Sequence, residues 1–216
     1  MSIAIAISTR GREDVLKHSV SQWKKHYPDA SIIIIEDNGD IPRGISATKN
    51  LCIEALIESG AEHCFLADDD VYPLDDIGLH LYIGLNVNHA CMSFDHTSNG
   101  KRISNEVFIH LKHPDWWSFN SPCGCLLYVS RELLLSGIRY DENFIRWGLE
   151  HKDFSIQVHK QGYTNIPFID IPNSTDHFYS HDYHLTAESS VPEHVRIDSI
   201  KRNTEYFNEK HNVWTK

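Results

Sequence analysis

Residues 65 to 73 are Phe65-Leu66-Ala67-Asp68-Asp69-Asp70-Val71-Tyr72-Pro73, an apolar run that changes abruptly into three consecutive carboxylates. This pattern predicts a buried β-strand with acidic side chains at its carboxyl end. Because side chains alternate along a strand, we expect Asp68 and Asp70 on one side and Asp69 on the other. Open α/β sheets bind ligands at this edge.

Two carboxylates on one side of a strand lie about 7 Å apart along the chain. Such a pair suits Mg²⁺ or Mn²⁺, which bind oxygen ligands and leave positions for water and substrate phosphates. The motif therefore predicts a metal–diphosphate site. A solvated acidic turn after a strand is the alternative interpretation.

The length of 216 residues fits one α/β domain, and a net charge of -10 argues against a protein that binds nucleic acid by bulk electrostatics. No stretch approaches the roughly 20 apolar residues of a membrane span, and the first residues lack the basic region of a signal peptide. These features predict a cytoplasmic protein. The five cysteines are scattered, which indicates reduced core residues, and Cys123-Gly124-Cys125 lacks the second pair that a zinc site needs.

Apolar runs at 3–7, 31–35 and 63–67 alternate with helical patterns and predict βαβ units, whose crossovers should be right-handed. We expect the second helix to begin with Ser46 as its N-cap and to end at Gly60. A third helix should follow Pro73, with Ile77, Leu81 and Leu85 on one face. The remaining patterns predict strands at 90–94, 107–111, 124–129 and 166–171, a loop at 96–105, and helices beginning at about 130, 147 and 192.

The stretch Trp116-Trp117-Ser118-Phe119 is an aromatic cluster close to two prolines. Aromatic side chains here could form ordinary core or a platform for a ring-shaped ligand. General burial tendencies favour the core.

Polar residues follow each of the first strands: Ser8-Thr9-Arg10, then Glu36-Asp37, then Asp68-Asp69-Asp70. Gly44, Ala47 and Asn50 lie between the second and third of these, and Trp147-Gly148-Leu149-Glu150-His151-Lys152-Asp153 lies downstream. In this order and spacing the chain resembles GT-A glycosyltransferases, most closely the family 2 type, over residues 3 to about 165. The resemblance implies a single-domain, Rossmann-like α/β fold with a mixed, mostly parallel sheet flanked by helices. It further implies a nucleotide-sugar half at about 1–95, an acceptor half at about 96–190 and a C-terminal helix at about 192–211.

The same resemblance implies the residues of the site. The nucleotide sugar would contact Thr9, Arg10, Asp37, Gly44, Lys49, Asn50, Asp68 and Asp69. Asp70 would bind the metal, helped by a histidine of the run from 176 to 184, for which His177 and His181 are the candidates. Imidazole suits Mn²⁺ better than Mg²⁺, so a histidine ligand favours manganese.

The catalytic base is expected at Glu150 or His151. The family often has Gly-x-Glu-Asp at this motif, whereas here His151 follows the glutamate. A base positioned on the acceptor hydroxyl would take its proton, and the resemblance implies inversion at the anomeric carbon. The structural alternative is that these acidic residues only stabilise a helix N-terminus.

The resemblance predicts transfer of a hexosyl or pentosyl group from a nucleoside-diphosphate sugar, with UDP-sugar favoured, to a hydroxyl acceptor. A glycan is favoured over a hydroxylated base in DNA, because the chain is acidic. Three other classes compete: a non-catalytic nucleotide-sugar-binding module, a phosphatase of the haloacid-dehalogenase type and a nucleotidylyltransferase. Tyr72 does not match the phosphatase motif, and Ser8-Thr9-Arg10-Gly11-Arg12 is a poor match to a Gly-rich phosphate loop.

Overall fold

The computed structural model describes residues 1–94, 97–98, 101–102, 109–181 and 193–212. Its elements are, in chain order, β1 Ile3–Thr9, α1 Glu13–His26, β2 Ser31–Glu36, α2 Ile45–Ser59, β3 His63–Asp68, β4 Val71–Pro73, α3 Gly78–Gly84, β5 His89–Cys91, β6 Thr97–Ser98, β7 Lys101–Arg102, β8 Ile109–Lys112, β9 Trp117–Phe119, β10 Leu126–Ser130, α4 Arg131–Leu135, α5 Glu150–Lys160, β11 Ile169–Asp170, α6 Ser174–His177, β12 Phe178–Ser180 and α8 Glu193–His211. Parts of the loop expected at 96–105, the start of the strand expected at 107–111 and residues 182–184 of the histidine-rich run lie outside the described residues.

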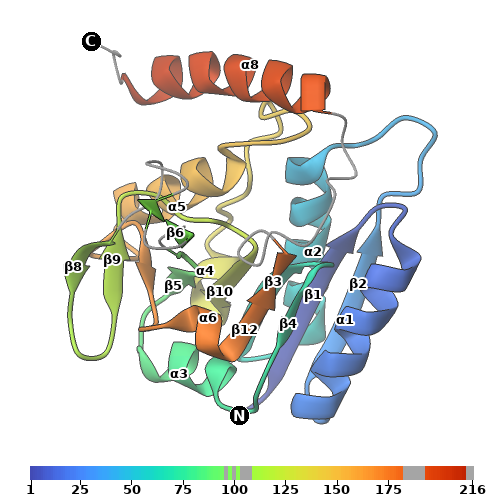
Figure 1. Cartoon of the computed structure of the whole chain (residues 1–216), viewed down its shortest axis with the longest axis vertical. Coiled ribbons are helices and arrows are strands. Elements are labelled where there is room, and N and C mark those ends of the chain that lie inside the picture. Colours follow the sequence, from blue (N-terminus) through green and yellow to red (C-terminus); the bar gives the residue numbers. More distant parts are fainter. Residues whose placement is uncertain (95–96, 99–100, 103–108, 182–192, 213–216) are drawn as a thin grey trace.

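A five-stranded sheet forms the centre of the molecule, in the order β2-β1-β3-β10-β5 (Figure 1). Strand β1 pairs in parallel with both β2 and β3, and β10 runs antiparallel between β3 and β5. Residues 4–7 and 64–67 are fully buried, as in strands covered by helices on both faces. The expected mixed, mostly parallel α/β sheet is confirmed.

Helices pack on both faces of this sheet. Trp23 of α1 belongs to the same core as Phe65, whereas Leu56 of α2 and Phe154 of α5 pack with Leu66 in a second core. Neighbouring residues of β3 thus point into different cores, because side chains alternate along a strand. The carboxyl end of β3 therefore lies between two helical layers.

The helix expected after Pro73 is present, but the prediction of its buried face was wrong. Leu79 and Tyr82 are fully buried, whereas Ile77 and Leu81 are 50% and 38% exposed. The helix begins only at Gly78. Tyr82 contacts aromatic side chains of the core, and this tertiary contact decides the orientation of a helix of only seven residues.

The N-cap of α2 is Gly44 rather than the expected Ser46. Gly44 has φ +95, a conformation that glycine adopts without steric cost. The Ser46 hydroxyl is buried and donates to the carbonyl of Phe144 at 3.2 Å. The Ser46 hydroxyl therefore binds a residue 98 positions away in the chain instead of capping the helix.

Smaller sheets surround the central one. Strand β12 pairs antiparallel with β4, with Ser180 opposite Val71, and the order β11-β9-β8 forms a separate three-stranded sheet. The sequence patterns predicted neither β4 nor β12, and the strand expected at 166–171 is limited to Ile169–Asp170. The pairing with β4 brings the histidine-rich run next to the acidic motif.

Helix α8 lies across the molecule beyond α5, at the end opposite α3 (Figure 1). Lys210 Nζ lies 2.6 Å from Asp141 Oδ2 and 2.9 Å from Asp153 Oδ1, and His211 Nε2 lies 2.8 Å from the same Asp153 oxygen. Burial raises the pKa of Asp141, but hydrogen bonds from Lys210 and the backbone of Asn143 outweigh it and lower that pKa to about 2. Within the described ranges, no helix is both long and apolar enough to cross a membrane.

Candidate functional site

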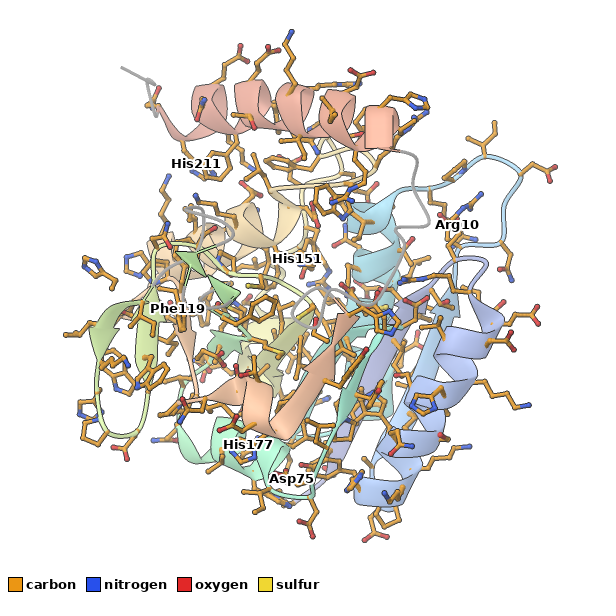
Figure 2. The ribbon with its side chains drawn as sticks, in the orientation of Figure 1. Arg10, Asp75, Phe119, His151, His177 and His211 are labelled. Atoms are coloured by element: carbon orange, nitrogen blue, oxygen red, sulfur yellow. The ribbon has the colours of Figure 1, made fainter. Side chains whose placement is uncertain are left out.

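The loops after β1 and β2 meet at the carboxyl edge of the sheet. Arg10 Nη1 donates to the carbonyl of Asp37 at 2.7 Å and lies 3.3 Å from its carboxylate. That carboxylate is buried and also accepts the backbone N–H of Arg43 at 3.1 Å. Thr9 Oγ1 donates to Asp69 at 2.6 Å. The three residues expected to contact base and ribose therefore lie together, with Arg10 near the surface (Figure 2).

Lys49 and Asp68 form an ion pair at the end of β3. Lys49 is fully buried, and its Nζ lies 2.6 Å from Asp68 Oδ1. Burial lowers the pKa of Lys49, but the Asp68 carboxylate outweighs burial and the pKa is raised, so the ammonium stays charged. Removing one partner would leave an uncompensated charge beside the core. Lys49 thus fixes the position of the Asp68 carboxylate.

Asp69 and Asp70 share one cation, Arg12. Arg12 Nη1 lies 2.8 Å from Asp70 Oδ2, and the same guanidinium donates to both oxygens of Asp69. The expected alternation of Asp68 and Asp70 was wrong, because β3 ends at Asp68 and the next two residues form a turn. Burial raises the pKa of Asp69, against the hydrogen bond from Thr9 and the charge of Arg12.

Gly44 and Asn50 lie on the side of the site that faces residues 140–146. Asn50 Oδ1 accepts the backbone N–H of Tyr140 at 2.8 Å, and its Nδ2 donates to the carbonyl of the same residue at 3.0 Å. A Cβ added to Gly44 would lie 3.6 Å from the backbone nitrogen of Arg146. The structure brings neither Gly44 nor the Asn50 amide into contact with Asp68, Asp69 or Asp70, and the contact of Gly44 and Asn50 with a donor stays a prediction.

Glu150 and His151 begin α5 and are buried beside the end of β3. His151 Nε2 lies 3.0 Å from Glu150 Oε1, and the Tyr140 hydroxyl oxygen lies 3.3 Å from His151 Nδ1. The second carboxylate oxygen of Glu150, Oε2, is buried and has no hydrogen-bond partner within the described part of the chain. Burial lowers the pKa of His151, although Glu150 and Asp68 raise it, so the ring is neutral near pH 7.

Gly124 packs directly against this imidazole. A Cβ at position 124 would come within 2.2 Å of His151 Cδ2, and Gly124 has φ +82. Any other residue would displace the ring and also adopt a strained backbone conformation. Gly124 therefore helps to set the position of His151.

The structure separates the two histidines expected at the metal. His177 Nδ1 lies 2.6 Å from Asp75 Oδ2, beside α3 and away from His151 (Figure 2). The backbone N–H of Leu74 donates to the His177 carbonyl, so His177 is about four residues, or roughly 13 Å, along the strand from Asp70. His181 follows Ser180, which pairs with Val71. His181 and Asp70 are thus the residues next to the Ser180–Val71 pair, where β12 ends and the turn before β4 lies.

Asp70 and His181 stay the predicted ligands of a divalent ion. His181 Nδ1 is buried and has no hydrogen-bond partner among the described residues. No group of three or more His, Cys, Asp or Glu side chains is placed for a metal within those residues. Two protein ligands are nevertheless enough where substrate phosphates and water supply the others. The chemistry of this pair, one carboxylate and one imidazole, suits Mn²⁺.

The loop before Glu150 has an unusual backbone conformation. Arg146, Gly148 and Leu149 all have positive φ, with values of 58, 103 and 71. Asn203 of α8 is fully buried, and its Nδ2 donates to the carbonyls of Ile145, Trp147 and Gly148 at 3.1, 3.0 and 2.9 Å. One amide group from the C-terminal helix thus stabilises the strained loop from which Glu150 begins.

We expect Asn203→Leu to lower the free energy of unfolding by about 1–3 kcal/mol, because it leaves buried carbonyls without a donor. Urea denaturation followed by circular dichroism measures the change. Asn208→Leu, at a half-buried position of the same helix outside this network, is the matched control. Equal midpoints for the two variants would show that the loop does not depend on Asn203.

Sequence analysis missed Arg12, Gly124 and Asn203. Arg12 follows Arg10 and Gly11 in the loop after β1. The only sequence signal for its role was that it is the second basic residue of a loop expected at the same edge of the sheet as the acidic motif. Gly124 lies between two cysteines, where a glycine before a strand indicates a close approach. Nothing in the local sequence of α8 distinguishes Asn203 from Asn208.

No protein-family model and no curated protein sequence matches this chain. Among solved structures, TarS of S. aureus superposes over 100% of this chain and 44% of its own, with 11% identity and a TM-score of 0.58. The mannosyltransferase PcManGT from Pyrobaculum calidifontis, solved in complex with GDP-Man and Mn²⁺, superposes over 80% of this chain and 55% of its own, with 13% identity and a TM-score of 0.50. The chain thus spans about half the length of either structure. Its fold is that of the GT-A glycosyltransferases.

Proposed function

We propose that this protein transfers a glycosyl group from a nucleoside-diphosphate sugar, a UDP-sugar in the first instance, to a hydroxyl of a glycan, with inversion. The observation that carries the proposal is the position of Asp68 and Glu150. Lys49 Nζ lies 2.6 Å from Asp68 Oδ1 and is also acted on by the charge of Glu150, so both carboxylates lie around one buried ammonium at the carboxyl edge of the sheet. Glu150 has a buried oxygen without a partner among the described residues.

The nucleotide would bind over the loops after β1 and β2. The buried carboxylate of Asp37, oriented by Arg10 and the backbone of Arg43, can accept a hydrogen bond from a nucleobase N–H. Thr9 and Asp69 then lie towards the ribose. Arg12 and Arg10 are the cations nearest to the diphosphate.

Asp70 and His181 would bind the divalent ion, with manganese favoured. When bound, the ion supplies Lewis-acid neutralisation of the leaving diphosphate. PcManGT, which has the same fold, was solved with Mn²⁺ and a nucleotide sugar, which supports this assignment. Arg12 neutralises Asp70 in the ligand-free chain, so we expect it to shift towards Asp69 or a phosphate oxygen.

Glu150 Oε2 takes the proton of the acceptor hydroxyl as its oxygen forms a bond to the anomeric carbon. The bond between that carbon and the diphosphate oxygen breaks, and the nucleoside diphosphate leaves with the electron pair. Attack on the face opposite the leaving group inverts the configuration. His151, neutral and with Nε2 3.0 Å from Oε1, orients the carboxylate.

Calorimetry with UDP, GDP and CDP in the presence of Mn²⁺ tests the donor site. We expect UDP to bind most tightly, and Asp37→Ala to weaken it by about 5- to 150-fold, because a buried hydrogen-bond partner of the base is lost. Asp40→Ala, which changes an exposed aspartate of the same loop, is the control.

If Asp37→Ala keeps the affinity and the order of the three nucleotides, Asp37 is only a turn residue. If none of the nucleotides binds the wild type, the transferase proposal itself fails. A protein that binds UDP but neither hydrolyses nor transfers from UDP-sugars would be a nucleotide-sugar-binding module instead.

A further inference from the structure

A pocket of about 140 Å³ opens beside the end of β5, on the opposite half of the sheet from Asp37. Three of its lining residues are aromatic, four are small and polar, and one is aliphatic: Phe94, Trp117 and Phe119, then Ser93, Asn173, Ser174 and Thr175, then Ile109. They come from the end of β5, from β9 and from the start of α6. Phe119 marks this region in Figure 2.

The pocket lies at the same edge of the sheet as the acidic motif. Strands β3 and β5 are parallel to each other, because both pair antiparallel with β10. The backbone N–H of Asp68 donates to Cys125 and that of Met92 donates to Leu126, so the two strands end at the same level. Two strand spacings separate them, which is about 10 Å. This leaves room for the donor sugar between the acidic motif and the pocket.

The walls of the pocket are fixed by buried contacts. Asp170 is fully buried, and its Oδ2 accepts the backbone N–H of Ser93 at 2.7 Å. Its Oδ1 accepts the hydroxyl of Tyr82 and the backbone N–H of Ile171. Lys112 Nζ lies 4.1 Å from the centre of the Trp117 ring. The pocket is therefore formed before any ligand binds, as is usual for small-molecule sites.

Its lining matches a neutral ring with an apolar face and a hydroxylated edge. Aromatic faces carry partial negative charge and attract polarised C–H groups, while hydroxyl and amide side chains pair with ring hydroxyls. Ser174 is 2% exposed, and its hydroxyl, although near Asp170, has no hydrogen-bond partner of normal geometry in the described structure. None of the lining residues is charged, which disfavours a phosphate-bearing ligand.

We propose that this pocket binds one pyranose ring of a neutral glycan acceptor, an inference that rests on the proposed glycosyl transfer. The volume agrees with a single ring, since a cavity of roughly 150 Å³ takes one benzene molecule. The rest of a longer glycan then lies outside the pocket. Trp117 and Phe119 stack on the ring, and Ser174 donates to one of its hydroxyls.

Saturation-transfer NMR with the methyl glycosides of glucose, galactose, mannose and N-acetylglucosamine tests the pocket without any donor. At least one glycoside should bind the wild type. Trp117→Ala should weaken it by about 10-fold or more, through loss of the stacking surface. Ser174→Ala should weaken it by about 2- to 10-fold, through loss of one neutral hydrogen bond. Trp116→Ala removes the adjacent tryptophan, which stacks on His113 outside the pocket, and should leave binding unchanged.

The proposal is refuted if no glycoside binds the wild type, or if Trp117→Ala and Trp116→Ala change the glycoside affinity equally. If a short DNA duplex binds the wild type and Trp117→Ala loses this binding, the occupant of the pocket is DNA and not a glycan. UDP binding, measured on the same samples, separates the two proposals. Glycoside binding without binding of UDP, GDP or CDP contradicts the proposed glycosyl transfer but not the pocket, and UDP binding without glycoside binding contradicts only the pocket.

Discussion

Asp70→Ala abolishes the Mn²⁺-dependent part of UDP binding and leaves the fold unchanged. The carboxylate at position 70 is 18% exposed and interacts only with Arg12 among the ion pairs of the described residues, so its removal does not leave a buried charge unpaired. Arg12 keeps both oxygens of Asp69. Calorimetry of UDP with and without Mn²⁺ measures the effect, and thermal unfolding shows that the variant is folded.

The histidine-rich run provides a matched pair for the same experiment. His181→Ala should weaken Mn²⁺ binding by on the order of 10-fold or more, since even second-shell changes cost 10- to 100-fold at metal sites. His177→Ala should have no effect on the metal, because His177 is hydrogen-bonded to Asp75 at the far end of β12. Titration of Mn²⁺ alone gives this readout without any turnover.

Two results would contradict the metal assignment. One is unchanged Mn²⁺-dependent UDP binding in Asp70→Ala. The other is equal loss in the His177 and His181 variants, which would indicate that the run acts through folding of β12. Asp115→Ala, at an exposed carboxylate, controls for the loss of one negative charge.

The two central strands β1 and β3 could be predicted from the sequence because each is a short apolar run with a buried middle. Residues 4–7 and 64–67 form apolar runs too short for helices, and the helical patterns between them require crossovers. The pairing of β12 with β4 could not be predicted in this way. Each strand has only three residues, and more than 100 residues separate them, so no local period marks either.

The candidate site shows the same division. Thr9, Asp37 and Asp68 lie at or just after the ends of the first three strands, and the resemblance to GT-A glycosyltransferases, which rests on this order, implied their contact with the nucleotide sugar. The side of the sheet on which Asp70 lies could not be predicted, because side chains alternate only within a strand and β3 ends at Asp68. Lys49 is fully buried because Asp68 neutralises it, and that pair depends on the packing of α2 against β3.

Glu150→Gln slows turnover by on the order of 10²–10⁴-fold, the usual contribution of a general base, with little change in UDP affinity. Glutamine keeps the shape of the side chain, but it cannot take a proton from the acceptor. Glu150 Oε2 has no hydrogen-bond partner within the described residues, whereas the two ring nitrogens of His151 lie 3.0 Å from Glu150 Oε1 and 3.3 Å from the Tyr140 hydroxyl, so Glu150 is the stronger candidate.

His151→Asn should cost less, because His151 only orients the carboxylate. The pH profile gives an independent test. Burial lowers the pKa of His151, so the ring stays neutral as pH falls to its ordinary value of about 6.5 and protonates only below it. If His151 were the base, activity would fall with decreasing pH as the ring protonates. His151→Asn would then lose both the turnover and this fall in activity at low pH. A dead His151→Asn and an active Glu150→Gln would exchange the two roles, whereas two active variants would show that this helix start only supports the structure.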